Sequence, residues 1–274
     1  MSGLHSSDSK ISATVTVTVP AVRAPGDLGA AVRLTQVSKD FGDATRPRVL
    51  DRIDLTVSPG ELVCLVGASG CGKSTLLSII AGLDAPTAGT VEVSEARPAL
   101  MFQEPALFPW LTAGQNVELA LRLRGIPRAD RAVEAGRLLD LVHLDGASGK
   151  RVHELSGGMR QRVALARALG QEGRLLLMDE PFAALDAITR DVMHDELTRI
   201  WRQTGLSVVF VTHNVREAVR LGQRVVLLSS RPGRIVREWN VGIPQPRRIE
   251  DPAVGDLSTE ITDHLRREIA RHGR

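Results

Sequence analysis

The chain has 274 residues, of which 43% are hydrophobic and 24% are charged, so we expect a globular protein with a sizeable core. Its 35 Lys and Arg residues nearly balance 32 Asp and Glu residues, and only 3% of residues are aromatic, which disfavours a nucleic-acid-binding protein. No apolar run approaches the roughly 20 residues that cross a bilayer. The first ten residues show no signal-peptide pattern and the two cysteines form no CxxC pair, so we expect the reducing cytosol.

Residues 1–30 are rich in Ser, Thr, Pro and Gly, and this composition predicts a disordered tail. Residues 14–19 alternate as a strand would, but Pro20 ends the run and no partner strand is evident. An added edge strand is therefore the less favoured alternative.

From residue 31 the pattern is that of an α/β protein. Alternating apolar residues predict strands near 32–37 and 53–57, and the unbroken apolar run at 62–66 predicts a strand buried on both faces. A helix at about 73–81, ended by Gly82, should follow. Apolar residues such as Leu123 and Val133 predict a helical insert over 113–145.

The α/β pattern then returns, with expected helices at about 159–169 and 188–204 and strands at 99–102, 175–178, 208–211 and 225–228. Repeated strand–helix–strand order predicts a mostly parallel sheet with helices on both faces. Residues 241–274 should form a Pro-rich linker and a short amphipathic helix, because apolar residues recur there at every fourth position. Docking of that helix on its own domain is favoured over contact with a partner.

A glycine-rich loop at 67–75 matches the pattern GxxxxGK[ST], between a predicted buried strand and a predicted helix. Its residues are Gly67, Ala68, Ser69, Gly70, Cys71, Gly72, Lys73, Ser74 and Thr75. Glycines allow backbone N–H groups to turn toward phosphate oxygens, and the helix start adds partial positive charge. Lys73 would supply a point charge to the outer phosphates, and the Ser74 hydroxyl can ligate Mg²⁺.

Two adjacent acids, Asp179 and Glu180, follow the predicted strand at 175–178. Carboxylates at the end of a buried strand are costly unless a cation or a reaction uses them. We therefore predict that Asp179 belongs to the Mg²⁺ shell and that Glu180 polarises an attacking water, with a loop of two solvated acids as the alternative.

A second helix start built like an anion site occurs at Ser156, a natural N-cap that precedes Gly157 and Gly158. One nucleotide does not obviously need two such sites in one subunit. Either this is only a capped helix, or it serves a nucleotide held by another copy. Taken singly, His213 is more often structural than catalytic, Phe41 is more easily a core residue than a stacking one, and Gln103 is ambiguous.

Together the motifs resemble the nucleotide-binding subunit of an ATP-binding cassette (ABC) transporter over about residues 31–240, with LSGGMRQRVALARAL at 155–169 as the most specific segment. The resemblance implies an α/β fold with a phosphate-loop (RecA-like) core, a mostly parallel sheet, an antiparallel β edge and a helical subdomain at about 104–156. It also implies ATP and Mg²⁺ as ligands, and ATP hydrolysis coupled to solute transport, as in a translocase.

Roles of single residues follow from the resemblance. Asp179 would be the acid of the Mg²⁺ site and Glu180 the general base, while Gln103 would touch Mg²⁺ and sense the γ-phosphate. His213 would contact the γ-phosphate, and Phe41 would stack on adenine.

The family's assembly is a head-to-tail dimer of two copies. The resemblance implies that ATP on the phosphate loop of one copy is closed by Ser156, Gly157 and Gly158 of the other, with Asp186 at the dimer contact.

Residues 102–111, 179–186 and 230–235 are similar to segments of importers of aliphatic sulfonates, taurine or nitrate. This implies a peripheral protein on the cytoplasmic side of the cell membrane. Its partners would be two transmembrane permease subunits and, indirectly, a periplasmic or lipid-anchored solute-binding protein, with no nucleic acid. The apolar segment at 107–110 would border the groove that receives a permease helix.

The chain departs from the family pattern at Asn214, where an acid is usual, and segment 93–98 is short. The alternative function is a soluble ABC-type ATPase acting on nucleic acid or ribosomes, which usually carries two cassettes or a long coiled-coil insert. Because Cys71 lies inside the phosphate loop, we also expect thiol alkylation to block ATPase activity.

Overall fold

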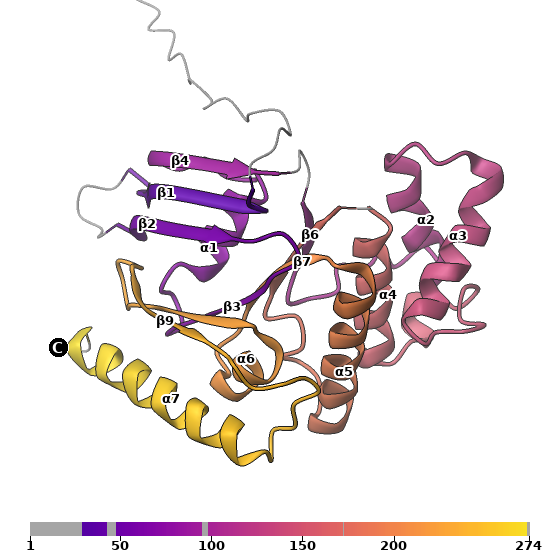
Figure 1. The fold of residues 1–274 in the computed structure, drawn as a ribbon. Helices are drawn as coiled ribbons and strands as arrows, with labels where there is room; N and C mark the ends of the chain where they lie inside the picture. The colour runs from indigo at the N-terminus through magenta and orange to yellow at the C-terminus, as the bar shows by residue number, and fades with distance from the viewer. Residues whose placement is uncertain (1–28, 43–47, 95–97, 172, 273–274) are drawn as a thin grey trace, which may run out of the picture.

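The structure, a computed structural model, describes residues 29–42, 48–94, 98–171 and 173–272 (Figure 1). The predicted disordered tail therefore lies outside the described residues, apart from Gly29 and Ala30. Within the described part of the chain, no helix combines the length and apolar character needed to span a membrane.

A six-stranded, mostly parallel sheet forms the centre of the fold. Its strands, in spatial order, are β5 (Ala99–Met101), β6 (Leu175–Asp179), β7 (Ser207–Val211), β3 (Leu62–Val66), β8 (Arg224–Leu228) and β9 (Ile235–Asn240). Neighbours are parallel except β9, which pairs antiparallel with β8. The mostly parallel sheet expected from the sequence is confirmed, whereas β9 was not predicted.

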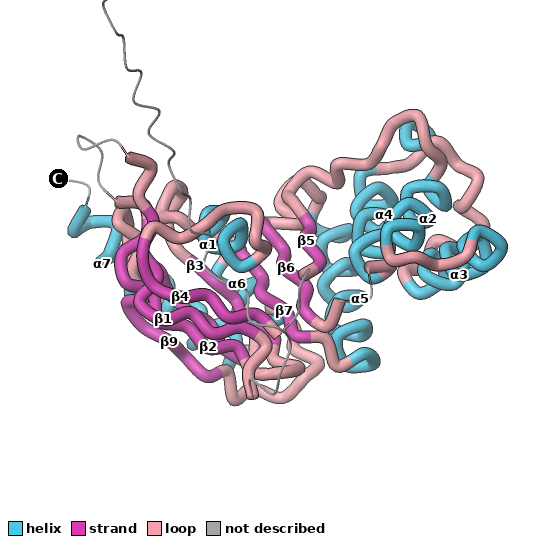
Figure 2. Tube along the Cα trace, turned by 90° about the horizontal axis from the view of Figure 1, so that it is seen from above, coloured by secondary structure: helices cyan, strands magenta, loops and turns pink. Residues whose placement is uncertain are grey.

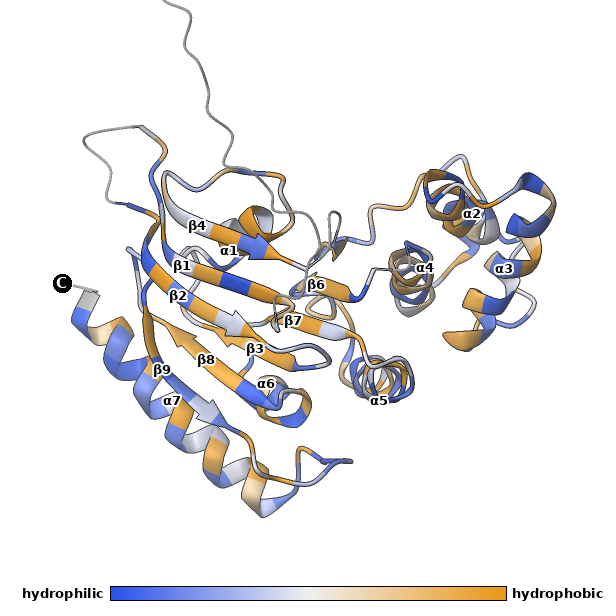
Figure 3. Cartoon of the chain, turned by 45° about the horizontal axis from the view of Figure 1, so that its top comes forward, coloured by the Kyte–Doolittle hydropathy of each residue, from blue (hydrophilic) through white to orange (hydrophobic). Residues whose placement is uncertain are grey.

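Alternate residues of the central strands divide the molecule into two hydrophobic cores. On β3, Leu62, Cys64 and Val66 pack into one core, whereas Val63 and Leu65 pack into the other. Figure 3 shows the concentration of hydrophobic residues in these strands. An apolar run without alternation is required here, because both faces of each strand are covered.

An antiparallel three-stranded sheet covers one side, in the order β2 (Leu50–Val57), β1 (Val32–Lys39) and β4 (Ala88–Val93). Its apolar residues and those of α1 (Lys73–Ile80) share a core with the central strands. This is the antiparallel edge implied by the family resemblance. Strand β4 was not predicted; its alternating apolar pattern is limited to Val91 and Val93, and its residues are at most partly buried.

The opposite face is covered by α4 (Gly157–Leu169), α5 (Ala187–Thr204) and α6 (Val215–Leu221). Helix α6 was not predicted. Beyond α4 a helical arm projects from the end of the sheet, formed by α2 (Ala113–Leu123), α3 (Arg128–Leu141) and a short 3₁₀ turn at Val152–Glu154 (Figures 1 and 2). Thr112 and Gln115 form a capping box that starts α2.

The helical insert predicted at 113–145 is present, but two of its apolar residues face solvent. Leu123 is 76% exposed and Val133 is 77% exposed, so they do not belong to the buried stripes of α2 and α3. The buried residues of α2 follow a different face, which includes Val117 and Leu121.

The C-terminal helix α7 (Pro252–His272) docks on its own domain, beside α6 and β9 (Figure 1). Ile261 is fully buried in the large core, and the Trp239 Nε1–H group donates to Glu260 at 2.9 Å. The favoured of the two interpretations is confirmed, and with 21 residues the helix is longer than expected.

The linker before α7 is fixed by a buried guanidinium. Arg247, which is 4% exposed, donates to the carbonyls of Val219, Gly222, Val241 and Ile243. Two of these carbonyls lie at the end of α6, where a cation complements the helix dipole. One arginine therefore attaches the linker to both α6 and the residues that follow β9.

Truncation of Ile261 tests the docking of α7. Ile261→Ala should lower the free energy of unfolding by about 2–5 kcal/mol, because it leaves a cavity beneath the helix. Ile269→Ala on the same helix, where the side chain is 46% exposed, should change it by less than about 0.5 kcal/mol. Urea denaturation measures both, and equal effects would contradict docking.

Candidate functional site

A cavity of about 520 Å³ opens at the carboxyl ends of β3 and β6. Its walls are formed by Asp40, Phe41, Val49, Ser69, Gly70, Gly72, Lys73, Ser74, Thr75, Gln103, Asp179, Glu180 and Arg231. Ligands of open α/β sheets bind at this edge. The structure thus brings together the predicted phosphate loop, both carboxylates, Gln103 and Phe41.

The phosphate loop, residues 67–75, encloses the Lys73 ammonium. Lys73 is 5% exposed, and its Nζ donates to the carbonyls of Gly67 at 2.9 Å and Ala68 at 3.0 Å. Gly72 is the N-cap of α1 with φ of +102°, and a side-chain carbon there would lie 2.6 Å from Leu50. Only glycine fits that position, and having no side chain it leaves the first N–H groups of α1 uncapped, as an anion site requires.

Asp179, the acid at the end of β6, lies in a partly buried environment that favours binding of a cation. Burial is the largest influence on Asp179 and raises its pKa, a hydrogen bond with Ser74 acts in the opposite direction, and Glu180 raises it further. Two oxygen side chains in contact, beside a second carboxylate, form a donor set that suits Mg²⁺. Ser74, Gln103 and Asp179 all line the cavity, so the residues predicted for the metal fit it.

Glu180 and His213 form a hydrogen-bonded pair, with Glu180 Oε2 2.8 Å from His213 Nδ1. Glu180 has a φ of +44°, which costs a non-glycine residue about 1–2 kcal/mol. Its backbone N–H donates to the Val211 carbonyl at 2.9 Å, which holds this conformation against β7. Strained residues cluster at functional sites, and this one has its carboxylate hydrogen-bonded to the histidine.

At the rim of the cavity, Phe41 is 64% exposed, with the Lys39 ammonium 4.9 Å from the ring centroid. An exposed aromatic ring beside a phosphate loop is suited to stacking on a planar base. Gln103 follows β5 and lines the cavity. Its backbone carbonyl accepts a hydrogen bond from the Gln161 side chain at 3.0 Å.

The remaining predicted residues do not line the cavity. Ser156 caps α4, where its hydroxyl accepts from the Met159 N–H group at 3.2 Å, and Gly157 and Gly158 form the first turn. Asp186 caps α5 through the Thr189 N–H group, and this hydrogen bond lowers the Asp186 pKa. Within one chain, these residues act as helix caps.

Sequence reasoning missed several residues of the site. Arg231 reaches the cavity from the loop after β8, which is bound to β2 by the pairing of Gly233 with Val49 and Asp51. No local pattern reveals that contact. Gln161 was also missed: it is 2% exposed and its side-chain N–H groups bond the carbonyls of Gln103 and Pro181, joining α4 to both loops.

The departure at Asn214 has a structural explanation. Asn214 is the N-cap of α6, and its Oδ1 accepts from the backbone N–H groups of Arg216 at 3.0 Å and Glu217 at 3.3 Å. Asn and Asp are about equally good N-caps. The residue therefore performs the capping role that an acid would perform.

Comparison with known proteins gives consistent matches. The ABC transporter family profile matches residues 50–183. The nitrate import ATP-binding protein NrtD of Synechocystis sp. is 49% identical over 202 residues, covering 71% of this chain and 76% of that protein. The taurine import ATP-binding protein TauB of Mesorhizobium japonicum is 44% identical over 248 residues, covering 85% of this chain and 96% of that protein.

Solved structures agree. The dimeric structure of MJ0796, a bacterial ABC transporter cassette, is 32% identical with a TM-score of 0.69, covering 78% of this chain and all of that one. A dimeric post-hydrolysis state of the same cassette, bound to ADP and Pi, has a TM-score of 0.67 at the same identity and coverage.

The expectation for Cys71 is revised by its burial. Its side chain is 1% exposed, and burial raises the thiol pKa, so little reactive thiolate is available. An alkylating reagent should modify Cys71 in the folded protein at least about 10-fold more slowly than in urea. Mass spectrometry of timed samples measures the rates; equal rates would mean that the phosphate loop opens freely.

Replacement of Asp179 tests its electrostatic environment in the ligand-free protein. A raised folded-state pKa means that the native state binds the proton more tightly, so ionisation of Asp179 lowers stability as pH rises above 3.8. Asp179→Asn removes this penalty. In denaturant titrations the variant should gain stability relative to wild type as the pH rises from 3.8 through the raised folded-state pKa of Asp179. A stability difference that does not grow with pH would contradict the assignment.

Proposed function

Because the chain belongs to the ABC transporter family, we propose that it is the ATP-binding and ATP-hydrolysing subunit that energises an importer. The observation that carries the proposal is a single cavity in which the phosphate loop faces Asp179 and Glu180, with His213 bonded to Glu180 at 2.8 Å. The site therefore combines a cation that binds phosphate, oxygen ligands for a metal and a general base, all beside the place where a γ-phosphate would lie.

ATP binding follows from the loop geometry. The triphosphate would accept hydrogen bonds from the backbone N–H groups of residues 67–75, and its negative charge would draw the Lys73 ammonium from the carbonyls of Gly67 and Ala68. Phe41 would stack on the adenine ring from its exposed position at the rim.

Ser74, Asp179 and Gln103 would hold Mg²⁺. When bound, Mg²⁺ supplies positive charge that neutralises the phosphate oxygens. The same charge would favour the ionised form of Asp179, whose pKa burial raises in the ligand-free protein.

Hydrolysis would depend on the pair formed by Glu180 and His213. The Glu180 carboxylate orients a water and accepts its proton as the water oxygen attacks the γ-phosphorus. His213, whose side chain is 60% exposed, holds the carboxylate through Nδ1 and stabilises charge on the transferred phosphoryl group together with Lys73. The bond to ADP breaks, and phosphate leaves.

A second copy of the chain would complete the site. Ser156, Gly157 and Gly158 lie outside the cavity of their own chain, at an α4 N-terminus that could face phosphate oxygens of a neighbour. The solved cassettes at 32% identity are dimeric, which supports a dimer here. In a head-to-tail arrangement each copy would seal the other's nucleotide, with Asp186 at the contact.

The transported solute is inferred from relatives whose names specify nitrate and taurine import. We infer a small anionic or zwitterionic solute of that kind, an aliphatic sulfonate, taurine or nitrate, delivered by a periplasmic or lipid-anchored solute-binding protein. Nucleic acid or ribosome binding is not favoured, because these relatives are import subunits.

Two transmembrane permease subunits would be the membrane partners, with this chain peripheral on their cytoplasmic side. Phe108 and Trp110 are 37% and 67% exposed beside the helical arm, with ring centroids 5.4 Å apart. An exposed aromatic pair of this kind suits an apolar helix from a membrane subunit.

Substitution of the general base tests the proposal. Glu180→Gln should retain MgATP binding but lower kcat by at least about 100-fold, because the amide cannot accept the proton. ATP should also trap the variant as a dimer in size-exclusion chromatography with light scattering. The exposed Glu250→Gln is the matched control and should match wild type. Wild-type turnover in Glu180→Gln, or no hydrolysis by wild type, would refute the proposal.

A further inference from the structure

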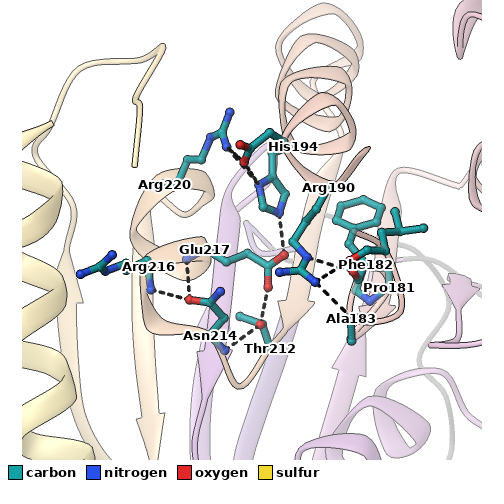
Figure 4. Close-up of polar contacts among 12 residues, drawn as sticks. Pro181, Phe182, Ala183, Arg190, His194, Thr212, Asn214, Arg216, Glu217 and Arg220 are labelled. Carbon is teal, nitrogen blue, oxygen red and sulfur yellow. Dashed lines mark hydrogen bonds and ion pairs between the residues drawn. The ribbon is translucent and has the colours of Figure 1, made fainter. Parts of the chain in front are cut away.

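A buried polar network joins Thr212 and Asn214, the residues on either side of His213, to Glu217 and His194 (Figure 4). We propose that Glu217, with Thr212 and His194, forms a positioning network that sets the orientation of His213 toward Glu180. These residues are not part of the cavity wall, so they act through His213. The inference rests on the proposed ATPase function.

The network holds the turn that carries His213 from both sides. The Thr212 hydroxyl, on a side chain that is 2% exposed, donates to Glu217 Oε2 and accepts from the Asn214 N–H group at 3.0 Å. The Glu217 backbone N–H in turn donates to Asn214 Oδ1 at 3.3 Å. The residues immediately before and after His213 are therefore both tied to Glu217, and the His213 backbone has little freedom to turn.

The second oxygen of Glu217 connects this turn to α5. Glu217 Oε1 lies 2.6 Å from Nε2 of His194, which is 1% exposed. Nδ1 of His194 lies 3.3 Å from a guanidinium nitrogen of Arg220. Because a guanidinium only donates, Nδ1 accepts and Nε2 carries the hydrogen that Glu217 receives. The donor and the acceptor are then assigned for every hydrogen bond of the network.

Burying these charged groups costs solvation free energy, which indicates a role beyond packing. Glu217 is a carboxylate that is 6% exposed, and Arg220, which is 8% exposed, pairs with Asp191 and Asp195 rather than directly with Glu217. Apolar residues of similar volume would fill a helix–helix contact more cheaply than buried charged groups. A fully bonded polar network instead fixes one geometry, and here that geometry is that of the His213 turn.

Helix α5 is itself fixed near the site. Arg190 donates to the carbonyls of Phe182 at 3.2 Å and Leu185 at 2.6 Å, which attaches the turn after Glu180 to the start of α5. The Phe182 ring also contacts His194, with centroids 5.6 Å apart. The network therefore joins the two segments that carry Glu180 and His213 behind the cavity, in addition to their direct bond.

Paired substitutions at Thr212 test the inference. Thr212→Val removes the hydroxyl with nearly the same shape, whereas Thr212→Ser retains it. Thr212→Val should lower kcat for ATP by about tenfold or more with KM within about threefold, because misplaced catalytic groups lose rate rather than binding. Thr212→Ser should restore kcat to within about twofold. Glu217→Gln should behave like Thr212→Val, and the exposed Arg216→Ala on the same helix is the control.

A spectroscopic readout separates positioning from general destabilisation. In protein with ¹⁵N-labelled histidines, the His213 Nδ1 resonance, assigned by its loss in His213→Ala, reports the bond to Glu180 without nucleotide. It should shift in Thr212→Val and keep its wild-type position in Thr212→Ser and Arg216→Ala.

Wild-type kcat in Thr212→Val would overturn the inference, whatever the resonance does. So would a reduced kcat with an unshifted resonance. If Glu217→Gln does not fold, the Thr212 pair decides alone. If wild type itself does not hydrolyse ATP, the proposed function fails, and the resonance still decides whether Thr212 orients His213.

Discussion

The arrangement of the site depends on the Lys73 ammonium being held by two backbone carbonyls of the phosphate loop. Its hydrogen bonds to Gly67 and Ala68 keep the phosphate loop closed around a buried positive charge. A buried cation whose hydrogen bonds all go to uncharged groups is costly, and this one lies at the start of α1, where the helix dipole adds further positive potential. The loop is thus built for a polyanion before any ligand is bound, and the strictly required glycine at 72 shows how closely the backbone is packed to achieve this.

The sheet brings the other reactive groups to that loop. Asp179 and Val211 are paired across β6 and β7, so the residues that follow these strands, Glu180 and Thr212–His213, emerge side by side at the same edge. Because each central strand is buried on both faces, its position is fixed by two cores rather than one. Sub-ångström placement of a carboxylate and a histidine on loops is possible only on such rigid strands.

Much of this could be predicted from the sequence, because the signals are local. Buried strands, the phosphate loop, the paired carboxylates and the cap at Ser156 each occupy a few consecutive residues with one dominant physical cause. The elements that were missed, β4, β9 and α6, are short, and their stability depends on packing against other elements, with β4 and α6 contacting β1 and β3 far along the chain.

The same limit applies to single residues. Arg231 reaches the cavity from a loop that lies far from the phosphate loop in sequence. The thiol of Cys71 is expected to react slowly because the side chain is buried within its own loop. The contacts of Glu217 with His194 and Thr212 join three elements, and no spacing in the sequence reveals them. Leu123 and Val133 lie in helices as predicted, but the sequence pattern does not reveal that their side chains face solvent.

A structure of the protein with Mg²⁺ and a non-hydrolysable ATP analogue tests the central claim most directly. The account predicts phosphates within hydrogen-bond distance of the backbone N–H groups of residues 67–75, Lys73 turned from its carbonyls toward them, and Ser156 of a second copy against the γ-phosphate. An empty loop, or nucleotide bound with both Ser156 corners far from any phosphorus, would contradict it.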